Sequence, residues 1–169
     1  ASDVSACSFA VGLTPLGVAF DGASIWVVNA NSNTVTKLRA SDGANLGSFA
    51  VGRAVGVAFD GANIWVANQD SDSVTKLRAS DGANLGSFAV GDLPLGVAFD
   101  GMHIWVANDL SNTVTKLRAS DGTCNGAANL PGSDVSACSF TVGTSPQQVA
   151  FDGANIWVTN GNSATVSKR

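Results

Sequence analysis

The stretch LGVAFDGASIWVVNANSNTVTKLRASDGANLGSFAVG begins at Leu16 and recurs almost verbatim along the chain. Its Ile-Trp-Val core occurs four times, with spacings of 39, 40 and 52 residues between the tryptophans Trp26, Trp65, Trp105 and Trp157. A period of about 40 residues with several short apolar runs is typical of repeat folds in which each unit packs on its neighbours. Because most residues are repeated, the positions at which the repeats differ are the candidates for a specific function.

Each repeat contains four strand-like runs separated by turn residues. In the first repeat these runs are residues 17–20, 25–28, 34–39 and 46–51, and an Asp-Gly dipeptide that favours a tight turn separates the first two. No segment of helical length has a 3.6-residue apolar period. The sequence therefore predicts an all-β fold, a β-propeller with four four-stranded antiparallel blades per chain. The predicted single domain, 1–169, divides into a closing strand at 1–12 and blades at 13–52, 53–91, 92–143 and 144–169, with an insertion at 123–134 in the third blade.

The two ends of the chain share one blade between them. The last repeat stops in the turn after its third strand, whereas residues 5–12 match a fourth strand that has no repeat of its own. We expect this N-terminal strand to complete the last blade, within the chain or in a neighbouring copy. The outcome would be a four-bladed ring, an eight-bladed dimer or a head-to-tail filament. The residues expected to form this closure are Cys7, Phe9, Val11, Val166, Ser167, Lys168 and Arg169.

The cysteines predict one disulfide and leave one residue over. Cys124 and Cys138 lie 14 residues apart across the insertion, and they form the most local of the three possible pairs. A disulfide that closes a loop of about 15 residues contributes about 3 kcal/mol in the chain-entropy treatment. Cys7 is then the odd cysteine, and three interpretations of it are open. It is a buried small residue, it forms a disulfide with another chain, or it remains from a longer parent sequence. Oxidising conditions favour an extracellular or cell-surface location.

Composition excludes some partners. The formal net charge is −4, and the nine basic residues are mostly one Lys and one Arg per repeat, so no basic patch for nucleic acid is expected. These Lys and Arg side chains are expected to form a solvated rim with local ion pairs to the Asp of the following turn. No apolar run approaches the roughly 20 residues needed to span a bilayer. The chain begins at Ala1 without a signal segment, which we interpret as a processed or trimmed start.

Three stretches, VANQDSDSVTKL at 66–77, VGDLPLGVAFDG at 90–101 and IWVANDLSNTVTKL at 104–117, resemble the YVTN-type propeller repeats of prokaryotic surface proteins. They are similar, less closely, to NHL repeats and to the blades of streptogramin lyases. The resemblance covers essentially the whole chain and is specific to the blade rather than to an activity. Such relatives usually have six to eight blades, so four blades imply an oligomer or a piece of a longer array.

The resemblance to lyases would make His103, the only histidine, a general base. It replaces Ser24, Asn63 and Asn155 of the other repeats, and the chain has no Glu and no second His to accompany it. A metal or acid–base site needs several convergent ligands. We therefore expect no catalytic residue, no metal site and no cofactor. The repeated tryptophans are expected to pack between blades rather than to form an aromatic ligand surface.

The predicted function is that of a non-catalytic extracellular scaffold for self-assembly or protein interaction. Its expected partners are other copies of itself, a surface protein or a glycan. One alternative is a ligand-binding propeller that uses the axial face, where repeats differ; the weakest is a streptogramin-lyase-like enzyme. The possible axial contacts are Arg53, His103, Gln147 and Gln148.

Overall fold

The computed structural model of the chain describes residues 7–124 and 134–169. Its regular elements there are strands, apart from two single-turn 3-10 helices, η1 (Ala30–Ser32) and η2 (Ser136–Cys138). Neither helix is long and apolar enough to cross a membrane. The predicted closing strand at 1–12 and insertion at 123–134 fall partly outside the described residues.

The strands form four antiparallel sheets, one for each sequence repeat. Blade 1 contains β1 (Pro15–Phe20), β2 (Ser24–Asn29), β3 (Thr34–Arg39) and β4 (Asn45–Ala50). Blade 2 contains β5 (Ala54–Phe59), β6 (Asn63–Asn68), β7 (Ser73–Arg78) and β8 (Asn84–Ala89). Blade 3 contains β9 (Pro94–Phe99), β10 (His103–Asn108), β11 (Thr113–Arg118) and β12 (Ser139–Thr141). Blade 4 contains β13 (Pro146–Phe151), β14 (Ile156–Asn160) and β15 (Thr165–Lys168).

The first turn of each blade is organised by an aspartate and a tryptophan. In blade 1 the Asp21 carboxylate accepts hydrogen bonds from the backbone N–H groups of Ala23 and Ser24, at 2.9 and 2.6 Å. Its second oxygen accepts the Trp26 indole N–H at 2.7 Å. The same set of bonds recurs in the other three blades. The Asp-Gly dipeptide thus sets the hairpin turn and also satisfies the polar atom of a large buried side chain.

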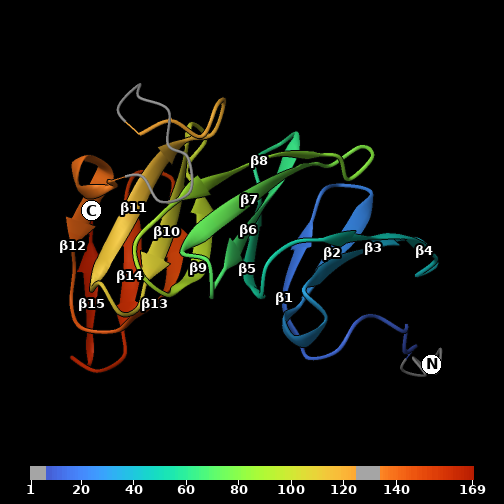
Figure 1. Ribbon diagram of the computed structural model, residues 1–169, viewed down its shortest axis with the longest axis horizontal. Coiled ribbons are helices and arrows are strands. Elements are labelled where there is room, and N and C mark those ends of the chain that lie inside the picture. Colours follow the sequence, from blue (N-terminus) through green and yellow to red (C-terminus); the bar gives the residue numbers. More distant parts are fainter. Residues whose placement is uncertain (1–6, 125–133) are drawn as a thin grey trace.

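The four blades lie side by side in sequence order, from blade 1 in blue to blade 4 in red (Figure 1). Their first strands contact in the order β1, β5, β9 and β13. The described N-terminal segment lies by blade 1 and the C-terminus in blade 4, at opposite ends of the arc. The predicted β-propeller fold is confirmed. Blade 4 has three strands in the described chain, because residues 7–12 form no strand there, so its N-terminal completion stays a prediction.

The predicted disulfide between Cys124 and Cys138 is present, with 5.5 Å between the two Cα atoms. Both cysteines are buried in the apolar cluster between blades 2 and 3. The disulfide therefore joins the end of blade 3's third strand region to the start of β12 within the core of the propeller. Cys7 is exposed in the segment that precedes blade 1.

Candidate interaction surface at the open ends of the arc

Every junction inside the arc packs the tryptophan-bearing face of one blade on the isoleucine-bearing face of the next. Between blades 2 and 3, the first face contributes Trp65, Ala67 and Val74, and the second contributes Ile104, Val106 and Leu117. Equivalent residues form the clusters between blades 1 and 2 and between blades 3 and 4. Trp26 and Trp65 are completely buried. The expectation that the tryptophans pack between blades is thus confirmed for the internal junctions.

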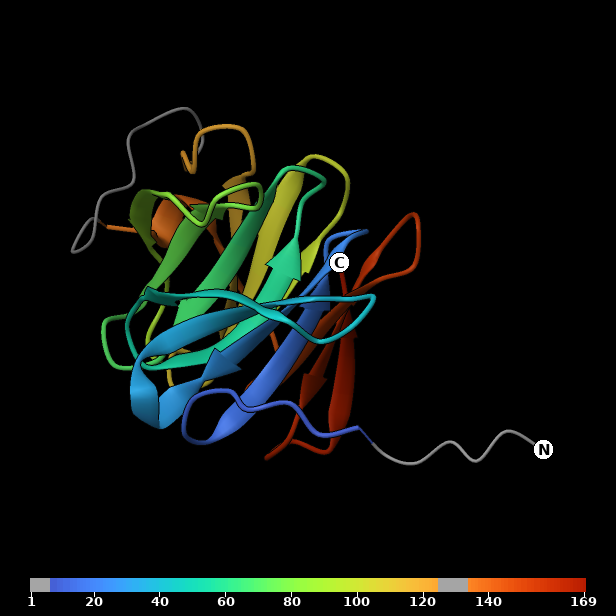
Figure 2. The same ribbon diagram turned by 90° about the vertical axis from the view of Figure 1, so that its right-hand side faces the viewer.

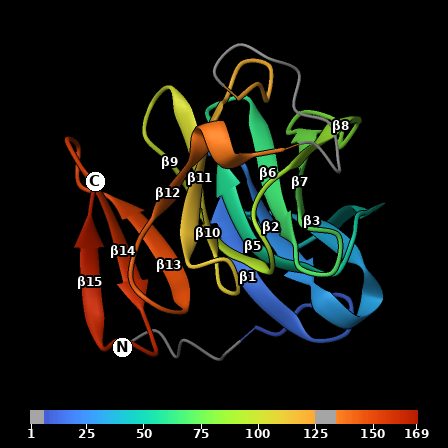
Figure 3. The same cartoon turned by 60° about the vertical axis from the view of Figure 1, so that its left-hand side comes forward.

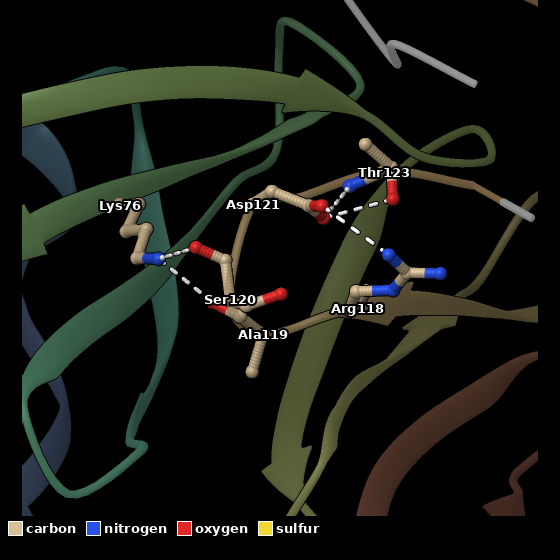
Figure 4. A network of polar contacts seen from close by, with 6 residues as sticks. All are labelled: Lys76, Arg118, Ala119, Ser120, Asp121 and Thr123. Atoms are coloured by element: carbon tan, nitrogen blue, oxygen red, sulfur yellow. Dashed lines mark hydrogen bonds and ion pairs between the residues drawn. The ribbon is translucent and has the colours of Figure 1, made fainter. Parts of the chain in front are cut away.

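In each of the first two junctions, a lysine from the third strand of one blade donates hydrogen bonds to the next blade. The Lys76 ammonium group donates to the carbonyl oxygens of Ala119 and Ser120 in the next blade, at 2.7 and 2.9 Å (Figure 4). It also lies 5.1 Å from the Trp65 ring centroid. Burial lowers the Lys76 pKa, although Asp60 and Asp121 oppose the shift. Lys37 makes the same contacts with Ala79 and Ser80.

The predicted solvated rim is therefore correct for the arginines and wrong for these lysines. Arg39 and Asp42 form an exposed ion pair at 2.9 Å within one turn, as do Arg78 and Asp81. Lys37 and Lys76 are instead buried, because carbonyl oxygens at the end of the adjacent blade's third strand replace the water around each ammonium group. Sequence alone shows a Lys in every repeat but not which blade it reaches.

A phenylalanine from the outer strand crosses each of the first two junctions in the same way. Phe49 lies 5.5 Å from Trp26 of its own blade, centroid to centroid, and its ring extends over Gly82 in the turn of blade 2. A Cβ on Gly82 would lie 1.9 Å from that ring, so only glycine fits. Phe88 and Gly122 repeat this contact between blades 2 and 3, at 2.2 Å.

The segment before β1 already occupies the corresponding place on blade 1. A Cβ on Gly43 would lie 2.1 Å from the Phe9 ring, as in the two internal contacts. Gly12 approaches Asn29 at 2.7 Å by the same measure, much as Gly52 approaches Asn68 at 2.8 Å. Phe9 and Gly12 thus lie against blade 1 as the outer strand of a preceding blade would.

The two ends of the arc expose the faces that the internal junctions bury. On blade 4, Trp157 is 38% exposed and Val166 is 58% exposed, whereas their counterparts Trp65 and Val74 are fully buried. Blade 1 exposes Leu16 and Val18 on β1. Viewed from the blade 1 side, no further sheet covers this end (Figure 2). From the other side, β15 is the last strand of the arc (Figure 3). We call these two surfaces the open ends.

The other residues predicted for closure lie at the blade 4 end, apart from Cys7 and Val11. The Ser167 hydroxyl accepts hydrogen bonds from the Asn160 side chain at 2.9 Å and from the Gly143 N–H at 3.3 Å. The Lys168 ammonium lies 5.3 Å from the Trp157 ring centroid. Arg169 pairs with Ile156 through the backbone, and its guanidinium donates to the Thr141 carbonyl oxygen of blade 3. Val11 is half-buried before β1.

The first strands of the blades line an axial groove with a cavity volume of about 640 Å³. Three of the four predicted axial contacts, Arg53, Gln147 and Gln148, line this groove. Arg53 pairs with Asp70 at 3.6 Å, and both side chains are largely exposed. His103 is not among the lining residues: it begins β10, where its Nδ1 lies 3.3 Å from the Asp100 carboxylate. A ligand contact at His103 stays a prediction.

At the axis the blades meet through glycines. A Cβ on Gly56 would lie 1.9 Å from the Leu95 carbonyl oxygen of the next blade. Gly17 and Gly96 face the next first strand in the same way, with 2.9 and 2.6 Å to the closest carbonyl oxygen. Blade 4 has Gln148 at this position. The open end of blade 4 therefore differs from the internal junctions at its axial edge. The sequence shows the replacement of glycine by Gln148, and the structure adds the reason why it matters, which is the close approach of neighbouring first strands.

Acid is expected to destabilise the blades through the aspartates of the first turns. Burial raises the pKa of Asp100, but the Trp105 N–H and the backbone N–H groups of His103 and Met102 outweigh it, so the pKa lies below the ordinary 3.8. The ionised Asp100 carboxylate therefore adds to the free energy of unfolding above pH 3.8, and this stabilisation is lost as the pH falls through the lowered pKa. We expect the free energy of unfolding, measured by urea denaturation, to fall steadily below about pH 4.

Asp100→Asn tests this contribution. The amide accepts fewer of the three hydrogen bonds, so we expect a loss of about 1 kcal/mol at pH 7 and a shallower decline below pH 4. Asp92→Asn, in the exposed loop before β9, is the matched control. It should leave unchanged both the stability at pH 7 and the decline of stability below pH 4. An identical acid decline in wild type and Asp100→Asn would refute the assignment.

Comparison with solved structures places the fold among known propellers. Hydrazine synthase from Kuenenia stuttgartiensis matches with a TM-score of 0.69 and 19% identity, over 100% of this chain and 52% of that chain. Catalytically inactive virginiamycin B lyase from Staphylococcus aureus with quinupristin matches with a TM-score of 0.69 and 16% identity, over 91% and 51%. The computationally designed Ika4 protein matches with a TM-score of 0.74 and 13% identity, over 96% and 94%.

These similarities are of fold alone, because every identity is below 20%. The sequence matches no protein-family model, and no curated protein matches it either. The chain spans about half the length of the hydrazine synthase and lyase chains that it matches.

Proposed function

We propose that this chain is a non-catalytic extracellular scaffold that works by binding an extended strand at the open edge of blade 4. The bound strand is the N-terminal segment around Phe9 and Val11. The observation that carries the proposal is the exposure of Trp157 and Val166, whose counterparts are buried in every internal junction. Strand addition supplies main-chain hydrogen bonds along an edge and side-chain pockets between them.

The register of the other blades specifies how this strand would lie. Outer strands pair with third strands through Val35 with Phe49, Val74 with Phe88 and Val114 with Phe140. By the same register Phe9 pairs with Val166, Ala10 with Thr165, and Ser8 with Ser167. Phe9 then lies next to Trp157, in the arrangement that Phe49 and Trp26 show at 5.5 Å.

Two further features support an extracellular scaffold. The Cys124–Cys138 disulfide is typical of proteins from oxidising compartments. The repeats resemble the YVTN-type repeats of prokaryotic surface proteins.

Hydrogen exchange of the full-length protein tests strand addition. We expect the amides of β15 that point away from β14 to exchange as slowly as those of β11, which has a strand on both sides. Phe9→Asp should raise the exchange of β15 and leave β11 unchanged, because it places a charge against Trp157. Leu110→Asp, at an exposed site in blade 3, is the control. Free exchange of β15 in the wild-type protein would refute strand addition.

A further inference from the structure

We propose that the partner at the open ends is a second copy of this chain, and that two copies close into one ring of eight blades. The inference rests on the proposed strand addition and names its partner. In this ring the N-terminal segment of each copy stays on its own blade 1 and adds to β15 of the other copy. The two joints between copies are equivalent by a two-fold axis along the centre of the ring.

The first argument is that the open ends are the two halves of one junction. Blade 4 presents the tryptophan-bearing face with Trp157 and Val166. Blade 1 presents the isoleucine-bearing face through the exposed Val18 and Phe20 of β1. Inside the chain these two kinds of face always meet. The surface that covers blade 4 is therefore blade 1 of a second copy, and a chain that carries one half of the junction at each open end is complementary to itself.

The second argument is the position of the N-terminal segment. Phe9 contacts Gly43 of blade 1 as Phe49 and Phe88 contact the glycine of the blade that follows them. Internal outer strands bind two blades at once, their own and the next. Phe9 makes the contact with the next blade, which is blade 1, but not the contact with a blade of its own. The blade that supplies it must lie directly before blade 1, which is the position of blade 4 in a second copy.

The third argument is polar. Lys37 and Lys76 each donate to the two carbonyl oxygens that begin the turn of the next blade. Lys168 lies over Trp157 as these lysines lie over Trp26 and Trp65. In the ring its acceptors are the carbonyl oxygens of Ala40 and Ser41 of the second copy. The joint thus repeats the polar as well as the apolar part of an internal junction.

Curvature selects the number of copies. The arc matches 51–52% of the length of the hydrazine synthase and lyase chains with TM-scores of 0.69, and we infer from this share that four blades make about half of a turn. The first strands contact in the order β1, β5, β9, β13, and β13 shows no comparable contact with β1 within the described residues. A complementary contact that closes forms a ring, whereas one that does not close forms a filament. Two half turns close, so we expect a dimer.

Gln148 makes the joint between copies wider at the axis. The glycines at this position in blades 1 to 3 leave no room for a Cβ beside the next first strand. At the joint, β13 and β1 of the second copy must therefore stand further apart than internal neighbours do. The Gln148 amide then lies beside the Leu16 carbonyl of the second copy, to which it can donate a hydrogen bond.

Native mass of the full-length protein is the primary test. We expect a species of twice the 17.0 kDa mass of one chain that persists on dilution. Val166→Asp changes a side chain that is exposed in the single chain, so the fold is retained while dimerisation weakens by about 100-fold or more. Leu110→Asp makes the same kind of change away from the open ends and should leave the dimer intact.

Mixing two defective variants separates exchange between copies from closure within one chain. Phe9→Asp spoils the added strand and Val166→Asp spoils the receiving face, so each alone is expected to be monomeric. A mixture retains one intact joint and should form a heterodimer.

A monomeric wild type with a protected β15 would overturn the dimer while strand addition stands. A ladder of polymers would also overturn the ring, and an exposed β15 in a monomer would overturn both proposals.

Discussion

Trp65→Ala is expected to lower the free energy of unfolding by about 3–5 kcal/mol, the range for removing a large aromatic side chain from a packed core. Trp65 is completely buried between blades 2 and 3, lies 5.5 Å from Phe88, and donates its indole N–H to Asp60 at 2.7 Å. The substitution removes the packing and also leaves the Asp60 carboxylate without its indole donor. Urea denaturation followed by far-ultraviolet circular dichroism measures the loss.

Trp157→Ala is the matched comparison, because the two tryptophans occupy the same place in their repeats. Trp157 keeps its bond to Asp152 at 2.6 Å but is partly exposed in the single chain. In the monomeric Val166→Asp background we expect a loss of only about 1–2 kcal/mol. In the wild-type background the substitution should also abolish the dimer. Equal losses for Trp65→Ala and Trp157→Ala in the monomer would show that the end of the arc is covered within the chain.

Gly56→Ala is expected to destabilise the protein by about 3 kcal/mol or more, because the new Cβ would lie 1.9 Å from the Leu95 carbonyl oxygen. The obstructing atom belongs to the backbone of the adjacent β9, so neither side can yield without moving a strand. The axial groove would widen between blades 2 and 3 and the arc would lose its curvature. Thermal and urea denaturation measure the loss of stability.

A graded series tests whether close approach is the cause. The corresponding distances are 2.6 Å for Gly96 and 2.9 Å for Gly17, so the losses should decrease from Gly56→Ala through Gly96→Ala to Gly17→Ala. Gln148→Gly is the converse change, and we expect it to tighten the dimer. A loss that is the same at all three glycines would point to backbone entropy instead of a steric cause.

Much of the fold could be predicted from the sequence because the repeat presents the same evidence four times. The Ile-Trp-Val cores placed β2, β6, β10 and β14, and the Asp-Gly dipeptides placed the turns before them. The disulfide was predictable because its two cysteines flank the only long insertion. His103 could not be placed, because a single sequence does not show which side chains meet at the axis.

The sequence by itself determined the blade and the number of blades per chain, whereas the sharing of the last blade between the two termini stays a prediction. The blade and the number of blades depend on local periodicity, turn chemistry and counting, which need no knowledge of long-range contacts. Only the tertiary structure decided which faces of the blades meet, that Lys37 and Lys76 reach across the junctions, and that Phe9 lies on blade 1. It also decided that the arc stays open, because curvature comes from the distance at which neighbouring first strands pack, and that distance depends on contacts between residues about 40 positions apart.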